Sequence, residues 1–266
     1  MSAVSTLGTT RGTTTRAGRL GALARAELTL LGRSKGTIFA ALFVPLTLPL
    51  AMRPAFENKE LKEAGLPVGT LLLTAAVGFS LLFAIYTTLT SVYVARREEL
   101  VLKRLRTGEL SDAEILVGAA LPAVCIAVAQ CLLVAIGCVA LLDAGVPEAA
   151  YLTVLGLLLG VVLCGALGAL TASFSRTTES AQVTALPMMF LSMMGSGIAF
   201  PLEILPDKVA SVCELLPLSP AITLIRGGWT GDLSASDALG AVVTAVAWTV
   251  MAVFAVRRWF RWEPRR

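Results

Sequence analysis

The sequence predicts an all-α membrane protein with six transmembrane helices and with both termini in the cytoplasm. Three observations support this fold class: the composition, the lengths of the uncharged stretches, and the distribution of Lys and Arg. Of the 266 residues, 56% are hydrophobic and only 15% are charged, with a mean hydropathy of +0.80. Soluble chains are about 45–50% apolar and about 25% charged. The composition therefore excludes an ordinary cytosolic enzyme, a nucleic-acid-binding module and a disordered tail.

Six stretches without charged residues are long enough to cross a bilayer, which takes about 17–25 residues of helix. They are residues 36–52, 64–95, 115–142, 149–175, 180–202 and 238–256. Inside hydrocarbon every backbone N–H and C=O must be paired within the protein, so we expect each stretch to be helical. The predicted spans are about 36–53, 69–95, 115–142, 150–174, 180–200 and 237–257.

The placement of positive charge sets the orientation. Of the 22 Lys and Arg residues, 17 lie on the side of the predicted membrane that holds both termini. Because Lys and Arg are enriched in cytoplasmic loops, we expect that side to be the cytoplasm. Residues 1–15 are rich in Ser, Thr and Gly and are expected to be disordered. The membrane domain is expected to cover 16–262, followed by a basic tail at 263–266.

The residue types that common catalytic and metal sites need are scarce. The chain has no His, which removes most zinc sites and every His-activated nucleophile. Its 5 Cys form no C-x-x-C pair, and no G-x-x-x-x-G-K-[ST] phosphate loop occurs. We therefore expect no catalytic residue, no metal and no cofactor in this chain, and no nucleic-acid partner.

A basic amphipathic helix is predicted over residues 16–34, directly before the first span. Its leucines recur at helical spacing, and arginines are spaced among them. Such a helix commonly lies in the membrane interface, and contact with a cytoplasmic partner is the alternative. The candidate residues of this interface helix are Arg19, Leu23, Glu27 and Leu31.

A second amphipathic helix is predicted between spans 2 and 3, at about residues 96–107. Its hydrophobic face consists of Val101, Leu102 and Leu105, and charged residues lie opposite. Gly108 is a helix stop, and Ser111 with Glu114 matches a capping box that opens span 3. The pattern fits equally a helix that docks into a protein groove and a connector that lies on the lipid surface.

Two sets of residues within the spans are candidates for a substrate pathway. Span 2 carries hydroxyl groups near its cytoplasmic half, and span 5 is rich in Met, which offers a flexible apolar surface. The candidates are Tyr86, Thr87, Ser91, Met189 and Met193. Packing between helices is the alternative for both sets. In span 4, Gly156 and Gly160 are four residues apart, a spacing that allows a second helix to approach closely.

Two short helices are predicted at the outer face between spans 5 and 6, at about residues 206–226. The first begins near Pro206, and the second is capped by Ser219 and ends at Gly227. Helices of this kind can bury against the protein rather than cross the membrane. The motif residues of this segment are Phe200, Pro201, Glu203, Pro206, Pro217, Pro220 and Arg226.

Two motifs resemble those of ABC-2 type transporter permeases. The loop between spans 2 and 3 is similar to that family's in Glu98-Glu99, in Leu102-Lys103-Arg104-Leu105-Arg106 and in Glu114-Ile115-Leu116. The segment after span 5 is similar in Gly195-Ser196-Gly197, in Phe200-Pro201 and in Leu215-Leu216-Pro217-Leu218-Ser219-Pro220. The resemblance covers about residues 16–262 and includes the number and orientation of the spans. Small permeases of drug-export pairs have a similar length.

In that family, two permease subunits pair with two cytoplasmic ATP-binding subunits, which bind ATP and magnesium. The resemblance implies export of a hydrophobic or amphiphilic substrate, such as a drug, a lipid or a lipid-linked molecule. A homodimer and a heterodimer both stay open, with the homodimer favoured. We expect membrane lipids as further neighbours and a bacterial inner membrane as the location. The resemblance also implies that the loop helix couples the permease to the ATPase, through Arg97, Glu98, Glu99, Val101, Leu102, Lys103, Arg104, Leu105 and Arg106.

Two other functions stay open on the sequence. A secondary transporter usually buries an ionisable residue within a span, and none lies in the six uncharged stretches. A membrane subunit without a transport function, such as a sensor or an assembly partner, needs no ATPase. Co-purification with an ATP-binding protein separates these alternatives from an ABC permease.

Overall fold

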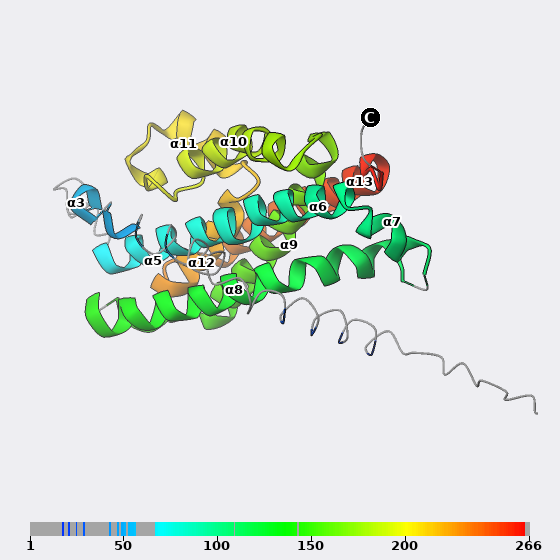
Figure 1. Cartoon of the computed structure of the whole chain (residues 1–266). Helices are drawn as coiled ribbons and strands as arrows, with labels where there is room; N and C mark the ends of the chain where they lie inside the picture. Colours follow the sequence, from blue (N-terminus) through cyan, green and yellow to red (C-terminus); the bar gives the residue numbers. More distant parts are fainter. Residues whose placement is uncertain are drawn as a thin grey trace, which may run out of the picture.

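The computed structural model describes residues 67–263 without Glu109 and Asp143, together with Gly18, Gly21, Arg25, Thr29, Phe43, Thr47, 49–51 and 53–56. The described part is helical and contains no strand, which confirms the all-α prediction there (Figure 1). The first predicted span, 36–53, lies largely outside the described residues. So do the candidate residues of the interface helix, which are Arg19, Leu23, Glu27 and Leu31.

Four helices coincide with predicted spans. They are the continuous helix Val68–Glu98, α8 (Asp112–Leu142), α9 (Ala150–Phe174) and α13 (Ala235–Trp259). The first of these consists of α5 (Val68–Phe79), the π-helical stretch η1 (Ser80–Thr87) and α6 (Thr88–Glu98). Within the described part of the chain, these four helices are long and apolar enough to cross a membrane.

The fifth predicted span, 180–200, is shorter in the structure. Helix α10 (Thr178–Gly195) ends five residues early, because the chain turns at Gly197, whose φ is 72°. Beyond it lie a 3-10 turn (Leu202–Ile204), α11 (Asp207–Glu214) and α12 (Ser219–Thr230). The last two helices meet at 98° and together are apolar enough to count as one broken span. The described residues thus hold four or five candidate membrane helices, and the count of six stays a prediction.

The helix Val68–Glu98 forms the centre of the bundle. Of its most apolar 18 residues, 89% are buried, against 28% for α8, 39% for α9 and 28% for α13. It packs against α8, α9, α10 and α12, which surround it in Figure 1. The other long helices keep large apolar side chains exposed, such as Leu133 and Ile136 on α8. These outward faces fit a lipid environment.

Helices α9 and α12 pack closely because glycines remove side chains from their contact. A Cβ atom placed on Gly156 would lie 2.8 Å from the carbonyl oxygen of Ala221, and one on Gly228 would lie 2.5 Å from the amide nitrogen of Thr153. A Cβ atom on Gly160 would lie 2.8 Å from Leu81 of the central helix. The prediction that the spaced glycines of span 4 allow close helix packing is therefore confirmed.

The second outer helix, α12, departs from its predicted bounds. It is largely buried against α9 and α13, and it continues through Gly227 to end at Thr230, with Gly231, whose φ is 77°, as its C-cap. The predicted stop at Gly227 is wrong because the small size of Gly227 serves packing against Leu233 rather than a turn. Ser219 does not cap the helix, since its hydroxyl donates to the carbonyl groups of Gly195 and Cys213.

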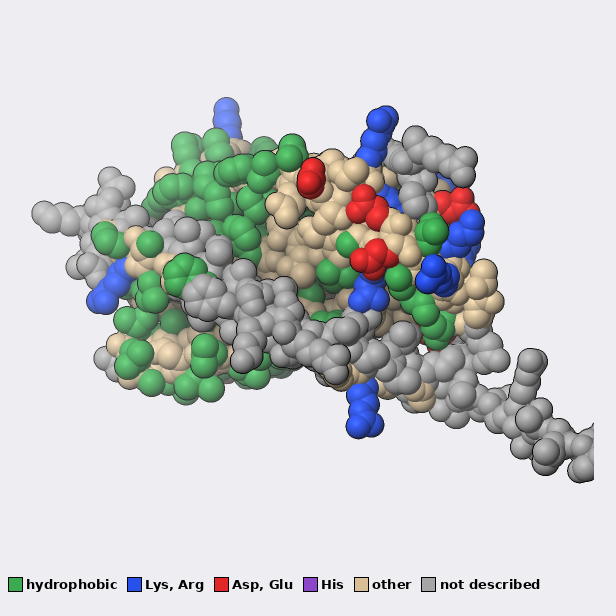
Figure 2. Space-filling view, viewed as in Figure 1, with side chains coloured by type: hydrophobic (Ala, Val, Ile, Leu, Met, Phe, Trp, Pro, Cys, Tyr) green, Lys and Arg blue, Asp and Glu red, His purple; other side chains and the backbone are tan. Residues whose placement is uncertain are grey.

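The bundle has two ends, which we name after the short helices that they carry. The α7 end is formed by Glu98, α7 (Val101–Arg106), Asp112, Phe174 and Trp259. The α12 end is formed by Val68, Leu142, Ala150, Thr230 and Ala235. Charged side chains of both signs gather at the α7 end in Figure 2. This is the end that the sequence predicts to be cytoplasmic.

Candidate functional site

The loop between the central helix and α8 contains two helical pieces rather than the single predicted helix over 96–107. Helix α6 ends at Glu98, and α7 begins at Val101. Between them Leu100 has a φ of 60°, the left-handed conformation, and it alone among the described non-glycine residues has a positive φ. A left-handed residue ends a helix and reverses the chain. The amphipathic pattern identified the helical residues but gave no signal for the break.

The hydrophobic face of α7 turns inward onto the bundle. Leu102 has an exposed fraction of 0%, and Val101 and Leu105 are half-buried. The prediction that Leu102 seats in a groove of another protein is wrong, because its own chain already surrounds it. The exposed side of α7 consists instead of Lys103, Arg104 and Arg106, with Glu98 and Glu99 just before the helix.

Arg97 is buried and connects the central helix to the end of α9. Its exposed fraction is 1%, and its guanidinium group donates to the carbonyl oxygens of Ala172 at 2.9 Å and Ser175 at 2.5 Å. Ala172 lies in the last turn of α9 and Ser175 is its C-cap, a helix end where a positive charge is favoured and free carbonyl groups need donors. Arg97 therefore holds two helices together and does not face a partner, contrary to the sequence-based expectation.

Glu98 lies beside Arg97 in the chain but on the surface. Its carboxylate accepts a hydrogen bond from the hydroxyl of Thr178 at 2.6 Å, which ties the end of α6 to the first residue of α10. The α7 end of the central helix is thus joined to α9 by a buried side chain and to α10 by an exposed one.

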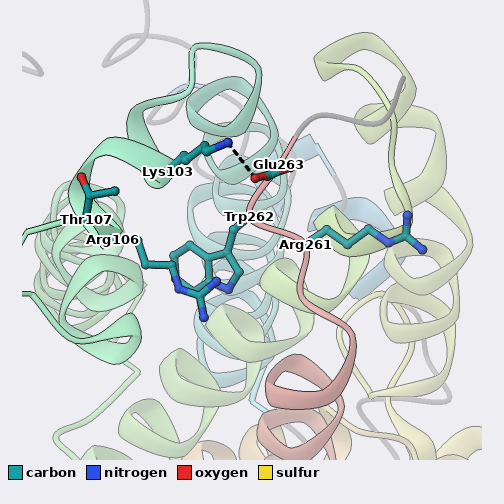
Figure 3. Close-up of a pocket in the computed structure, with 6 residues that line it drawn as sticks. All are labelled: Lys103, Arg106, Thr107, Arg261, Trp262 and Glu263. Carbon is teal, nitrogen blue, oxygen red and sulfur yellow. Dashed lines mark ion pairs between the residues drawn. The ribbon is translucent and has the colours of Figure 1, made fainter.

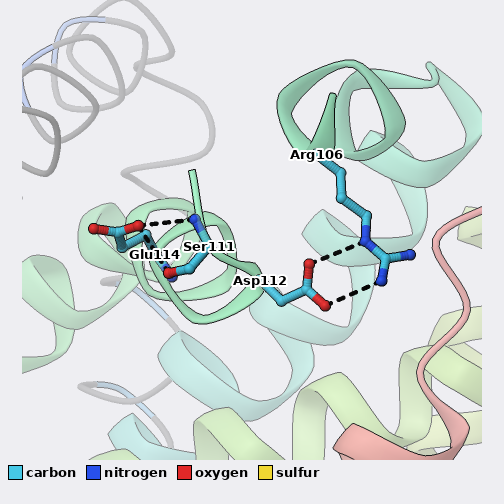
Figure 4. A network of polar contacts seen from close by, with 4 residues as sticks. All are labelled: Arg106, Ser111, Asp112 and Glu114. Carbon is cyan, nitrogen blue, oxygen red and sulfur yellow. Dashed lines mark hydrogen bonds and ion pairs between the residues drawn. The ribbon is translucent and has the colours of Figure 1, made fainter. Parts of the chain in front are cut away.

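The start of α8 is capped as predicted. The backbone N–H of Ser111 donates to the carboxylate of Glu114 at 2.8 Å, and the N–H of Glu114 donates back to the Ser111 hydroxyl at 3.4 Å (Figure 4). Next to this box, the guanidinium group of Arg106 binds both carboxylate oxygens of Asp112, at 3.0 and 3.3 Å. The two-point geometry fixes the last turn of α7 relative to the first turn of α8.

The residues after α13 also contact α7, which the sequence did not reveal. The ammonium group of Lys103 lies 2.8 Å from the carboxylate of Glu263, and the Arg106 guanidinium lies 4.9 Å from the ring centre of Trp262. A cavity of about 660 Å³ opens between the two segments (Figure 3), lined by Lys103, Arg106, Thr107, Arg261, Trp262 and Glu263. Trp262 and Glu263 escaped prediction because no periodicity or motif extends past the last span.

The pathway candidates fall into two groups. Tyr86 has an exposed fraction of 1%, and its hydroxyl bonds to the Thr171 hydroxyl at 3.1 Å and the Ala185 carbonyl at 3.3 Å, so it joins the central helix to α9 and α10. Met189 is buried on the inner stripe of α10. For these two, the packing alternative holds.

Three pathway candidates stay partly exposed. They are Thr87, Ser91 and Met193, which are half-buried. The hydroxyl of Thr87 donates to the carbonyl oxygen of Phe83 one turn earlier, so it makes no contact to another helix through that bond.

The motif after α10 forms the wall of the α12 end. Pro201, Pro217 and Pro220 are buried, Arg226 is half-buried, and Phe200 and Pro206 are exposed. Pro206 precedes α11 and Pro220 lies in the first turn of α12, as predicted. The side chain of Glu203 lies outside the described part of the chain. Most of this motif therefore shapes the turn between α10 and α12.

No group of three or more Cys, Asp or Glu side chains in the described part of the chain is placed to hold a metal ion. The free cysteines Cys131, Cys138 and Cys164 are buried in the helix bundle, as expected of small apolar side chains.

Comparison with known families agrees with the geometry. Residues 19–229 match the sequence model of the ABC-2 type transporter family, which is more than half of the chain. A comparison with curated proteins finds no match. The apolar helices and this match identify a multi-pass membrane protein. The chain therefore belongs to the ABC-2 type transporter family.

Proposed function

We propose that this chain is the permease of an ATP-driven exporter, acting as a homodimer with two cytoplasmic ATP-binding subunits. The family match supports the role of membrane subunit, and members of this family generally work with an ATP-binding subunit. In this assignment ATP and magnesium bind the partner, whose phosphate loop carries out phosphoryl transfer. The chain itself supplies the membrane pathway in a cell membrane, which we assign to a bacterial inner membrane.

The orientation of α7 is the observation that carries this proposal. A connector that lies on lipid would turn its hydrophobic face outward, toward the membrane. In α7 the hydrophobic Leu102 is buried in the bundle, and the outward face carries Lys103, Arg104 and Arg106. A charged face on a helix anchored to three neighbouring elements suits contact with a soluble protein. We therefore assign the coupling role to α7 and keep Glu98 and Glu99 beside it as contact residues.

The substrate that we propose is hydrophobic or amphiphilic. Within the predicted spans, charged residues are absent over 64–95, 115–142, 149–175, 180–202 and 238–256. A charged substrate would need paired polar groups at that depth. Thr87, Ser91 and Met193 remain candidates to face it because they keep partial exposure. Export is the direction that the family resemblance favours.

Co-purification with an ATP-binding subunit tests the proposal. The full chain would be co-expressed with candidate ATP-binding proteins, starting with any that is encoded beside it, and the detergent-purified complex assayed for ATP hydrolysis. The test variant is Arg104→Glu, which reverses an exposed charge on α7. We expect it to weaken the complex, since a reversed charge at an interface turns attraction into repulsion.

The matched control is Lys208→Glu, which makes the same charge reversal on α11 at the α12 end. We expect this variant to bind the ATP-binding subunit as the unmodified chain does. If no ATP-binding subunit binds the unmodified chain, the permease assignment fails and a membrane subunit without transport function takes its place. If both variants bind normally, α7 is not the contact.

A further inference from the structure

The segment that follows α13 crosses the α7 end of the bundle. Helix α13 ends where the N–H of Phe260 makes its last helical bond, to Val256 at 2.8 Å, and Phe260 itself is extended, with φ −65° and ψ 126°. Its ring packs edge-on against Tyr93 of the central helix, with 6.2 Å between ring centres, and against Trp262 at 5.0 Å. The aromatic contacts fix the direction in which the chain leaves α13.

Two contacts then bring this segment onto α7. Glu263 pairs with Lys103, and Trp262 lies under the guanidinium of Arg106 (Figure 3). Lys103 and Arg106 are three residues apart, so they lie on one side of α7. The segment Phe260–Glu263, which we call the C-terminal strap, therefore runs along the exposed side of α7.

We propose that Trp262 and Glu263 are positioning residues for the coupling helix. They hold the exposed side of α7 in one orientation relative to α13, so that a movement of α7 driven by the ATPase also moves α13. This inference rests on the proposed function, because it assumes that α7 contacts an ATP-binding subunit. It adds a link to the last membrane helix that neither the family match, which ends at residue 229, nor the sequence motifs contain.

The contacts between the strap and α7 are of a kind that orients a helix but adds little to the stability of the fold. The side chains of Lys103 and Glu263 are 55% and 66% exposed, and exposed ion pairs contribute little to the free energy of unfolding. A hollow of about 660 Å³ lined by residues of both the strap and α7 lies beside these contacts. By contrast, Leu102 and Arg97 fix the base of α7 and the end of α6 through buried contacts. The buried contacts therefore fix the position of α7, and the strap sets only the orientation of its exposed side.

Arg106 connects the strap to α8. It binds Asp112 through two nitrogen atoms and offers its flat face to Trp262, two interactions that use different parts of the guanidinium group. A tilt of α7 that breaks one contact changes the geometry of the other. The three elements α7, α8 and the strap are thus mechanically joined through one side chain.

Charge exchange between Lys103 and Glu263 tests the proposal. The variants are Glu263→Lys, Lys103→Glu and the double exchange, each co-expressed as full chain with the ATP-binding subunit. Two quantities are measured: the amount of ATP-binding subunit in the purified complex and the ATPase rate per assembled complex. The control is Glu214→Lys, the same reversal on α11 at the opposite end.

We expect Glu263→Lys to assemble and to unfold at the same temperature as the unmodified chain, with an ATPase rate changed by about two- to fivefold, the range over which an exposed ion pair shifts an equilibrium. Lys103→Glu should show the same change in the ATPase rate per assembled complex, with less complex recovered because Lys103 also lies on the proposed contact face. The double exchange should restore the rate per assembled complex, which a loss of general stability would not do. The rate changes of the two single variants should both become smaller at high salt, which screens exposed charges.

Two results would overturn the inference. If the single variants assemble and hydrolyse ATP at the unmodified rate, the strap does not position α7, while the permease assignment stands. If the double exchange is no better than the worse single variant, the ion pair is not the cause of the effect. Failure of the unmodified chain to bind any ATP-binding subunit removes the proposed function, and this inference with it.

Discussion

The two ends of the bundle are built by opposite means. At the α12 end, glycines of α9 and α12 bring backbones into direct contact, and nearly all of α12 is buried. At the α7 end, a short helix is held by one buried leucine and by exposed charged side chains. Close packing of backbones leaves few alternative arrangements, whereas exposed ion pairs can exchange partners at small cost. The α12 end is therefore built for rigidity, and the α7 end for small adjustments.

A substitution at Gly156 should have the largest effect, because it attacks the closely packed end. A leucine there meets the carbonyl oxygen of Ala221, a backbone atom that cannot rotate away. We expect Gly156→Leu to lower the free energy of unfolding by at least about 3 kcal/mol, the upper end of the usual cost of overpacking. The midpoint of thermal unfolding in detergent measures it.

Gly137 of α8 provides the control for that substitution. It lies in a predicted span like Gly156, but a Cβ atom there meets nothing within 4 Å. Gly137→Leu should unfold at or slightly above the temperature of the unmodified chain, since leucine favours helix more than glycine does. Equal losses for the two variants would contradict the idea that α9 and α12 are packed backbone to backbone.

Arg97→Met should have the next largest effect, because Arg97 is one buried, firmly held side chain at the otherwise adjustable α7 end. It removes the donors to the carbonyl groups of Ala172 and Ser175 at the end of α9. Hydrogen bonds to charged groups contribute about 1.5–3 kcal/mol, so we expect a loss of about 2 kcal/mol. Thermal unfolding measures this loss, with the exposed Arg104→Met as the control that should leave the unfolding temperature of the chain unchanged.

Leu100→Gly should have a smaller effect of opposite sign. A left-handed conformation costs a residue with a Cβ atom about 1–2 kcal/mol, and glycine gives part of this back through its greater freedom in the unfolded chain. Leu100, whose φ is 60°, has this unfavourable conformation in the folded state. We expect the glycine variant to be more stable by up to about 1 kcal/mol. A lower melting temperature would show that the turn does not have the described conformation.

Asp112→Asn, at the α7 end, should have the smallest effect on stability. Its partner Arg106 is 52% exposed, and exposed pairs are worth less than about 1 kcal/mol. We expect an almost unchanged unfolding temperature together with an altered ATPase rate in the assembled complex. A large loss of stability would mean that the α7 end is as firmly built as the α12 end.

The sequence predicted most of the membrane helices because charge and hydropathy alone decide them. The predicted span 150–174 coincides with α9, and the capping box of Ser111 and Glu114 begins α8 as expected. The paired glycines of α9 were also interpreted correctly. These features are local, since each depends only on residues within one or two helical turns.

The features that escaped prediction depend on residues far apart in the chain. From the sequence, Arg97 is expected on the surface because it is charged. Only the position of α9, some 75 residues later, places it inside the bundle, where it donates to carbonyl groups at the end of that helix. From the sequence, Gly227 is expected to end a helix. Only its contact with Leu233 shows that its small size serves packing instead. The strap contact of Glu263 with Lys103 joins residues 160 positions apart. Neither periodicity nor local motifs contain such information.

The π-helical stretch η1 has a consequence for comparing relatives of this chain. In a π-helix the bonding step is five residues rather than four, so Ser80–Thr87 holds more residues per turn than the α-helices on either side. Loss of one residue there lets the stretch return to α-helical bonding, so that α6 keeps its faces relative to α5. The same loss within an α-helical stretch would instead rotate everything after it by about 100°. An alignment that permits no gap in η1 would then assign Thr90 and Arg97 to the wrong faces. Lineages that gained or lost a residue are expected to have done so in this stretch.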